Sequence, residues 1–140
     1  MQRLVIDTNV YIDWFNAGRH EEIVFQRDAV KYLSAVVLME LRAGASSTKD
    51  RRVVQQVEAK FAGARRILVP SGRVYAEAGD VLRQLRVRRG FSLGGRRSIV
   101  NDVLIALSAR SIGATVATQN ERDYTAIRAV TPFQLVVVRS

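Results

Sequence analysis

The sequence contains no cysteine, a single histidine and only two prolines among its 140 residues. Without cysteine there is no disulfide and no thiolate metal site, which is typical of a protein from a reducing compartment. No apolar stretch approaches the ~18 residues that a membrane-spanning helix needs. Asp7 also interrupts the apolar N-terminal stretch where a secretory signal would continue. We therefore expect a cytoplasmic protein with no membrane segment.

Acidic residues are scarce, since 13 Asp and Glu stand against 22 Lys and Arg, for a net charge of +9 at pH 7. This basic excess is mostly arginine and favours an anionic partner, above all nucleic acid, because guanidinium groups match phosphate geometry. A solvated basic surface without a ligand is the alternative. With 48% hydrophobic and 25% charged residues, the chain should fold as one globular domain over residues 1–140.

Short apolar runs alternate with helical patterns along the chain. The runs predict five strands, at 4–6, 32–34, 67–69, 115–118 and 133–138. Apolar spacing predicts helices around 53–61 and 74–85, the second with Ser71 as its N-cap and its end near Gly90. Strands that alternate with helices pair in parallel, and continuous apolar runs indicate a sheet covered on both faces. The predicted fold class is therefore α/β, with three layers.

Three carboxylates interrupt these apolar segments. Asp7 ends the first predicted strand, Glu40 follows the run 36–39, and Asp102 lies inside the apolar helical pattern SIVNDVLIALSA. An unpaired buried carboxylate is costly, so such groups are neutral, paired with a cation or bound to metal. For any one of them an exposed helix edge or a loop cap would be explanation enough. Three together require a joint explanation.

Parallel α/β proteins bind ligands beyond the carboxyl ends of their strands. Asp7 belongs at that edge, as do Asn120 and Asp123 after the fourth predicted strand. Glu40 is expected about two turns into the helix after the second strand, leaning towards the same edge, and Asp102 in about the first turn of its helix. A carboxylate cluster without a nearby lysine repels itself, whereas Mg²⁺ binds oxygen ligands, usually one or two carboxylates with waters. Such a metal activates water for phosphodiester hydrolysis. An acidic site on a basic protein thus indicates a metal-dependent nuclease.

Four motifs, in this order along the chain, resemble those of the PIN-domain ribonucleases, in particular the VapC-like toxins of bacterial toxin–antitoxin pairs. They are DTN at 7–9, SAVVLMEL with Glu40, NDVLIALSA with Asp102 and TQNERDY at 118–124. The resemblance extends over essentially the whole chain. It implies a central parallel sheet of about five strands and Mg²⁺- or Mn²⁺-dependent cleavage of RNA. It also implies a homodimer and a cognate antitoxin that covers the site.

The same resemblance assigns roles to individual residues. Asp7, Glu40 and Asp102 correspond to the metal-site acids of the family. Thr8 and Asn9 correspond to the residues that hold Asp7 in place.

The fourth acidic position departs from the fullest family pattern. Asn120 occupies it by alignment, and Asp123, one helical turn on, is the nearest carboxylate and a predicted catalytic residue. An amide oxygen can ligate Mg²⁺ or orient a water but brings no charge, so the number of metal ions stays open. Thr118 either binds the substrate or a metal-bound water, or satisfies backbone at the strand end.

The segment GFSLGGRR is glycine-rich and basic. It either connects two helices or contacts a nucleic-acid backbone, and it lacks the Lys-Ser or Lys-Thr of a phosphate-binding P-loop. The predicted contacts with the RNA backbone are Arg96 and Arg97, with Arg86, Arg88 and Arg89 upstream.

The histidine and the aromatic residues, which could in principle take part in catalysis or binding, have simpler interpretations. His20, in the charged segment HEE, is predicted to be a surface residue. Tyr11, Trp14, Phe15 and Tyr75 are predicted to belong to the core or to a dimer interface. The sequence has no G-x-S-x-G, G-x-G-x-x-G or Cys/His zinc spacing.

Two other functions compete with the nuclease. The first is a catalytically weak or inactive module of the same fold that binds RNA or a protein partner, which Asn120 supports. The second is a phosphotransfer domain of the receiver type, which requires paired acids after the first strand and a lysine after the last strand but one. DTN and TQN supply neither.

Overall fold

The computed structural model describes residues 1–90 and 99–139. Its strands are β1 Gln2–Ile6, β2 Ala29–Ser34, β3 Ile67–Leu68, β4 Thr115–Thr118 and β5 Gln134–Val137. Its helices are α1 Thr8–Ala17, α2 Glu21–Val24, α3 Ala35–Gly44, α4 Thr48–Gly63, α5 Gly72–Arg89, α6 Ile99–Ser111 and α7 Glu121–Val130. The strands form one parallel sheet in the order β3-β2-β1-β4-β5.

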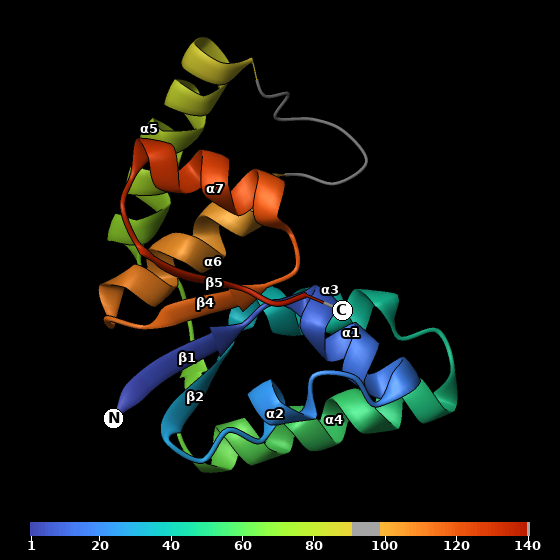
Figure 1. Ribbon diagram of the computed structural model, residues 1–140. Coiled ribbons are helices and arrows are strands. Elements are labelled where there is room, and N and C mark those ends of the chain that lie inside the picture. The colour runs from blue at the N-terminus through green and yellow to red at the C-terminus, as the bar shows by residue number, and fades with distance from the viewer. Residues whose placement is uncertain (91–98, 140) are drawn as a thin grey trace.

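Helices cover both sides of this sheet. Figure 1 shows α5, α6 and α7 gathered on one side and α1, α2 and α4 on the other. The predicted α/β fold, with three layers around a parallel sheet of about five strands, is therefore confirmed.

Burial along the strands follows their place in the sheet. The last three residues of β1 and all four residues of β4 are buried, because helices cover both faces at the centre. At the edge, β5 alternates between exposed and half-buried residues. Several predicted boundaries are wrong. The strands β1 and β2 begin earlier than predicted, at Gln2 and Ala29, and β5 is shorter by one residue at each end. The strand β3 ends at Leu68, leaving Val69 67% exposed.

Polar side chains start the helices at the carboxyl edge of the sheet. Asp7 caps α1 directly after β1, Ser34 caps α3 as the last residue of β2, and Asn120 caps α7 two residues after β4. The chain therefore turns from strand into helix with a polar residue at each junction. Elsewhere, the predicted Ser71 cap of α5 is confirmed, and Gly90 is the C-cap of that helix, with a φ of 67° that suits glycine.

The helix α6 is buried along almost its whole length, with Val103, Ile105 and Ala106 fully inaccessible. Burial of each large apolar side chain here contributes about 1.5–3 kcal/mol to folding. A carboxylate in the first turn of such a helix needs polar partners that the apolar neighbours cannot provide.

The aromatic residues divide between core and surface. Tyr11 is buried, and Trp14 and Phe15 pack against the core, as predicted. Tyr75 is 56% exposed and is not a core residue. Along the described part of the chain, no helix combines the length and apolar character needed to cross a membrane.

Candidate active site

Asp7 leaves β1 at the centre of the carboxyl edge and is completely buried. Its Oδ1 accepts the Thr8 backbone N–H at 2.8 Å, while its Oδ2 accepts the Thr118 hydroxyl at 2.7 Å and the Asn9 amide at 3.3 Å. Thr118 ends the neighbouring strand β4. Donors from both central strand ends therefore stabilise the buried carboxylate.

Glu40 approaches from α3 and is half-buried. Its Oε1 accepts the Thr8 hydroxyl at 2.7 Å, and its Oε2 accepts the Asn101 amide at 3.4 Å. Thr8 thus joins Glu40 to Asp7, with its hydroxyl on one and its backbone N–H on the other. Asn101 joins Glu40 to α6, directly before Asp102.

Asp102 lies in the first turn of α6 and is 1% exposed. Its Oδ2 accepts Nδ2 of Asn120 at 3.2 Å, and the same Nδ2 donates to Oδ2 of Asp123 at 3.0 Å. The backbone N–H of Asn120 donates to the Thr118 hydroxyl oxygen at 3.0 Å. Because the Thr118 hydroxyl also binds Asp7, the bonds run without a break from Asp7 to Asp102.

We call Asp7, Glu40, Asp102 and Asp123 the acid cluster. All four predicted acids lie in one hydrogen-bonded network, with Thr8, Asn9, Thr118 and Asn120 as its links. At the fourth position, Asn120 places one amide between two carboxylates, and so separates two like charges with a donor. Both Asn120 and Asp123 thus border the site, and their separate roles remain predictions.

The oxygen atoms in and around the acid cluster suit a hard divalent cation. They are carboxylate, amide and hydroxyl oxygens, which are the ligands that Mg²⁺ and Mn²⁺ favour. Within residues 1–90 and 99–139, no three Asp, Glu or His side chains form a ready-made metal site. Mg²⁺ commonly binds through only one or two carboxylates with waters and substrate phosphate completing its shell, so the residues present fit such an ion.

Sequence reasoning missed three polar residues around the acid cluster. Asn101 and Gln119 each stand beside a predicted site residue, and that adjacency was the available signal. The prediction for His20 is wrong, because its side chain is 3% exposed and its ring contacts the amide of Gln119. A left-handed backbone at His20, with φ of 65°, turns a residue from a charged segment inward.

Two hollows flank the N-terminal helices. One, of about 320 Å³, lies beside Glu40 and is lined by Ile12, Phe15, Leu41, Lys49 and Asp50 among others. It extends the surface next to the acid cluster between α1, α3 and α4.

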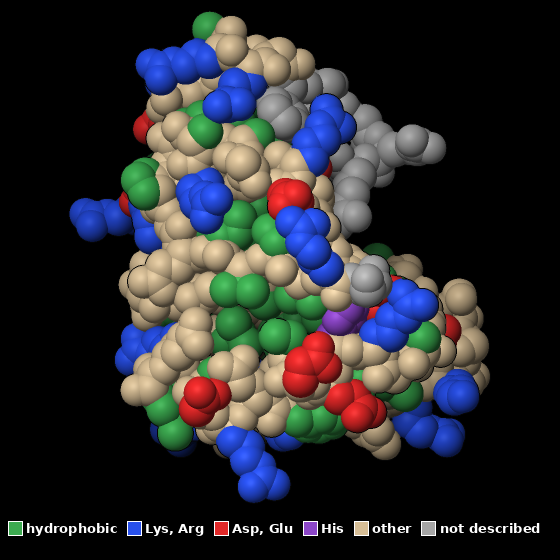
Figure 2. Space-filling view, in the orientation of Figure 1, with side chains coloured by type: hydrophobic (Ala, Val, Ile, Leu, Met, Phe, Trp, Pro, Cys, Tyr) green, Lys and Arg blue, Asp and Glu red, His purple; other side chains and the backbone are tan. Residues whose placement is uncertain are grey.

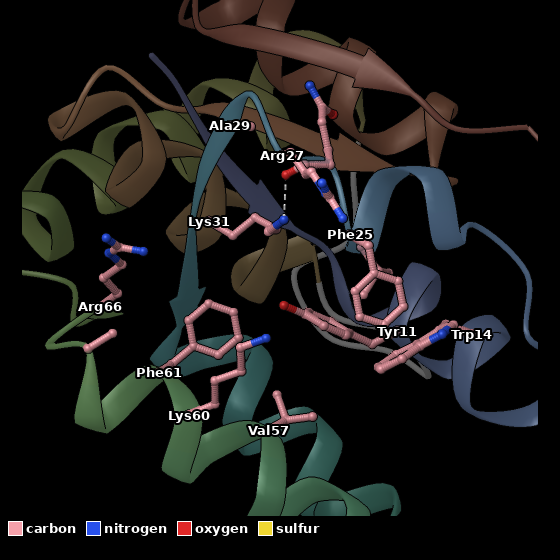
Figure 3. Close-up of a pocket in the computed structure, with 13 residues that line it drawn as sticks. Tyr11, Trp14, Phe25, Arg27, Ala29, Lys31, Val57, Lys60, Phe61 and Arg66 are labelled. Atoms are coloured by element: carbon pink, nitrogen blue, oxygen red, sulfur yellow. Dashed lines mark hydrogen bonds between the residues drawn. The ribbon is translucent and has the colours of Figure 1, made fainter.

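The second hollow, of about 410 Å³, contains no residue of the acid cluster. Figure 3 shows the rings of Tyr11, Trp14 and Phe25 on one wall and Phe61 with Lys60 on the other. Arg27, Lys31 and Arg66 also line it, and none of its lining residues is acidic. Burial, and then the charge of Lys60, lower the pKa of Lys31. We call this hollow the basic-rimmed pocket.

Basic side chains are spread over the surface. Figure 2 shows more Lys and Arg than Asp and Glu on the face it presents. Arg86, Arg88 and Arg89 are exposed in the last turn of α5, as expected for contacts with a ligand. Arg96 and Arg97 lie outside the described residues.

Solved structures of VapBC proteins are similar in fold to this chain. VapBC2 from Rickettsia felis, bound to a DNA fragment from their promoter, matches with a TM-score of 0.71 and 22% identity, over 99% of this chain and 100% of that chain. DNA-bound VapBC from Salmonella typhimurium matches with a TM-score of 0.70 and 22% identity, over 98% of each chain. VapBC-5 from Mycobacterium tuberculosis matches with a TM-score of 0.67 and 23% identity, over 99% and 100%.

No curated protein sequence gives a significant match to this chain. The sequence profile of the PIN domain, however, matches residues 4–129, which include every acid of the cluster. The resemblance found in the four sequence motifs is thereby confirmed, and the chain belongs to the PIN domain family, with a fold that matches VapBC toxin–antitoxin structures.

Proposed function

We propose that this protein is an endoribonuclease that depends on Mg²⁺ or Mn²⁺ and hydrolyses phosphodiester bonds in RNA. The observation that carries the proposal is the burial of Asp7 and Asp102 in one hydrogen-bonded network. Both carboxylates are almost completely buried, they come from distant parts of the sequence, and one hydrogen-bonded chain connects them. A divalent cation would offset their mutual repulsion and use their charge.

In this proposal Asp7, Glu40 and Asp102 hold the metal ion, one or two of them directly and the others through bound water. When bound, the ion lowers the pKa of a water molecule and stabilises the leaving oxygen of the phosphodiester. Thr8 fixes the relative positions of Asp7 and Glu40 through its two donors. Asn120 joins Asp102 and Asp123 through one amide nitrogen, and Asp123 would accept a proton or orient water beside them.

Arginines outside the acid cluster would bind the RNA backbone. The net charge of +9 supports this, because phosphate contacts supply most non-specific affinity for nucleic acid. Arg86, Arg88 and Arg89 lie on the exposed end of α5, and Arg96 with Arg97 follow them in sequence. Specificity for a particular RNA requires further contacts with bases.

We further propose that the chain, as a single domain of residues 1–140, acts in the cytoplasm as the toxin of a VapBC-type pair and forms a homodimer. The support is the match to VapBC structures over nearly the full length of both chains. The basic-rimmed pocket, with aromatic walls and four cations, suits an apolar partner segment that carries carboxylates.

The antitoxin proposal is tested with the product of the neighbouring upstream reading frame, which we expect to be a small DNA-binding protein. It should bind this chain and inhibit RNA cleavage. Charge reversal by Lys60→Glu with Arg66→Glu should weaken that complex at least tenfold, while Asp80→Lys, on the exposed face of α5, should not. If wild type, the double charge-reversal variant and Asp80→Lys all bind the antitoxin with equal affinity, the pocket is not part of the interface.

The nuclease proposal is tested by thermal unfolding with and without millimolar Mg²⁺ or Mn²⁺, together with RNA cleavage. Metal binding to the native state raises the unfolding temperature in wild type, because it adds RT ln(1 + [L]/Kd) to stability. Asp7→Asn should lose both the shift and the cleavage. Asp80→Asn, which changes an exposed carboxylate, should retain both. A metal-induced shift in Asp7→Asn equal to that of wild type would refute the shared site.

A second candidate is a PIN-fold module that binds RNA or a partner without cutting. The amide at Asn120, where the fullest family pattern has a carboxylate, favours it. RNA binding that is unaffected by EDTA, with no cleavage in Mg²⁺ or Mn²⁺, would support this module over the nuclease.

A further inference from the structure

Gln119 holds the end of β4 against α1 by two separate contacts. Its backbone N–H donates to Oδ1 of Asn9 at 3.1 Å. Its side-chain Nε2 lies 2.6 Å from Oδ2 of Asp13 and 2.7 Å from Nε2 of His20. Asn9 and Asp13 are four residues apart on α1 and therefore share one face of that helix. Gln119 thus spans one turn of α1, beside the acid cluster.

The backbone contact of Gln119 fixes which way the Asn9 amide faces. Since Oδ1 of Asn9 accepts the Gln119 N–H, its Nδ2 must turn the other way. There it donates to Oδ2 of Asp7 at 3.3 Å and lies 3.4 Å from the Thr118 hydroxyl oxygen. A reversed Asn9 amide would bring its oxygen against the Asp7 carboxylate, which repels it. The orientation set by Gln119 therefore supplies Asp7 with one of its donors.

The side-chain contacts of Gln119 depend in turn on His20. The amide nitrogen Nε2 of Gln119 carries two hydrogens, so it can donate one to Asp13 and the other to the His20 ring. The imidazole Nε2 also lies 3.5 Å from Oδ2 of Asp13, and it accepts from Gln119 in the tautomer that carries the ring proton on Nδ1. The Gln119 hydrogen bond is also the main reason that the pKa of Asp13 lies below its ordinary value. His20 is 3% exposed on its side chain, so this acceptor is shielded from water.

The backbone of His20 has an unusual conformation that capping of α2 does not explain. His20 has φ of 65°, a left-handed conformation that side chains other than glycine rarely adopt. It stands at the N-cap of α2 yet makes no side-chain cap bond. Its ring points instead to Gln119, on the strand end that leads into the acid cluster.

We propose that His20 and Gln119 are positioning residues for Asp7, which act through Asn9 and do not touch substrate or metal. His20 accepts from the Gln119 side chain, Gln119 fixes the Asn9 amide, and Asn9 donates to Asp7. This inference rests on the proposed function, because positioning matters for chemistry at Asp7. It extends the site to His20, which lies outside all four family motifs.

The test compares His20→Leu with His20→Gln. Both variants carry the same backbone strain at φ of 65°, so their difference isolates the hydrogen-bond acceptor. A glutamine Oε1 reaches the place of the imidazole Nε2 and can accept from Gln119, whereas leucine cannot. In RNA cleavage with Mg²⁺, His20→Leu should lose roughly tenfold in kcat with little change in KM, as outer partners of metal sites do. His20→Gln should recover to within about twofold of wild type.

A second readout needs neither metal nor activity. In metal-free protein labelled with ¹⁵N, the side-chain amide of Asn9 should give a shifted, slowly exchanging resonance in wild type and His20→Gln. In His20→Leu the same resonance should move toward the value of a solvated amide and exchange faster. Resonances unchanged in His20→Leu would overturn the proposal whether or not the protein cuts RNA. If wild type does not cleave RNA although the Asn9 resonance differs between the variants as expected, the result would count against the proposed function alone.

Discussion

Replacing Asn120 by aspartate gives a quantitative test of the acid cluster. Nδ2 of Asn120 lies 3.2 Å from the Asp102 carboxylate and 3.0 Å from that of Asp123. A carboxylate at this position would face two like charges, and each pair costs about 1–5 kcal/mol at effective dielectric constants of about 80 to 20. Since rotation toward solvent relieves part of this, we expect Asn120→Asp to lose about 2–4 kcal/mol of unfolding free energy in EDTA at pH 7.

Loss of the α7 cap does not contribute to this change in stability, because aspartate caps a helix as well as asparagine does. The control is Asn120→Ser, which keeps a capping oxygen and removes the amide without adding charge, and which should lose only about 1 kcal/mol. Urea denaturation measures both variants. Millimolar Mg²⁺ should restore Asn120→Asp but not Asn120→Ser. The gap between them should also close below about pH 4, where carboxylates bind protons.

The reasoning fails if Asn120→Asp is as stable as Asn120→Ser in EDTA at pH 7. Equal stability would mean that Asp102 and Asp123 do not face position 120 as charged groups. Destabilisation that persists in Mg²⁺ would mean that no cation binds among these carboxylates.

Three further predictions concern the surroundings of the site. The Gln119 hydrogen bond holds the pKa of Asp13 below its ordinary 3.8. This bond therefore stabilises the folded protein fully above pH 3.8, and the stabilisation is lost as the pH falls through the pKa of Asp13 in the folded state. The stability gap between wild type and Gln119→Leu in urea should therefore shrink from about pH 5 to about pH 2. Arg96→Ala with Arg97→Ala should reduce the log–log salt slope of RNA binding by about 0.7 per lost contact and leave metal binding intact; an unchanged slope would make the segment structural. Ser71→Ala should lower the unfolding free energy by about 1 kcal/mol through loss of the α5 cap, with metal-induced stabilisation unchanged.

The fold was predictable from the sequence where residues are apolar on both faces of an element. The bounds of β4 were predicted without error because all four of its residues are buried. The start of β2 was missed because Lys31 breaks its apolar pattern. The Lys31 side chain turns back so that its Nζ donates to the Gln26 carbonyl at 2.7 Å. Periodicity alone does not reveal such a turn.

The candidate site divides in the same way. The meeting of Asp7, Glu40 and Asp102 followed from parallel strand order, which brings strand ends and helix starts to one edge. The connecting donors did not follow, because which amide faces which carboxylate depends on side-chain directions in the assembled fold. The burial of His20 was not predicted because the two residues that follow it, Glu21 and Glu22, are charged. Its own backbone is left-handed, and its ring lies inside the fold.

The most direct test of the central claim uses Asp102→Asn, which changes a buried carboxylate into a neutral group of nearly equal size. RNA cleavage is measured in Mg²⁺, and chemical denaturation is measured in EDTA. If Asp102 serves a metal ion, the variant should be inactive and at least as stable as wild type without metal, since repulsion within the acid cluster is reduced. If Asp102 instead pairs structurally with a buried cation, the variant should lose on the order of 3–5 kcal/mol. An easily unfolded variant whose folded fraction still cuts RNA would contradict the account.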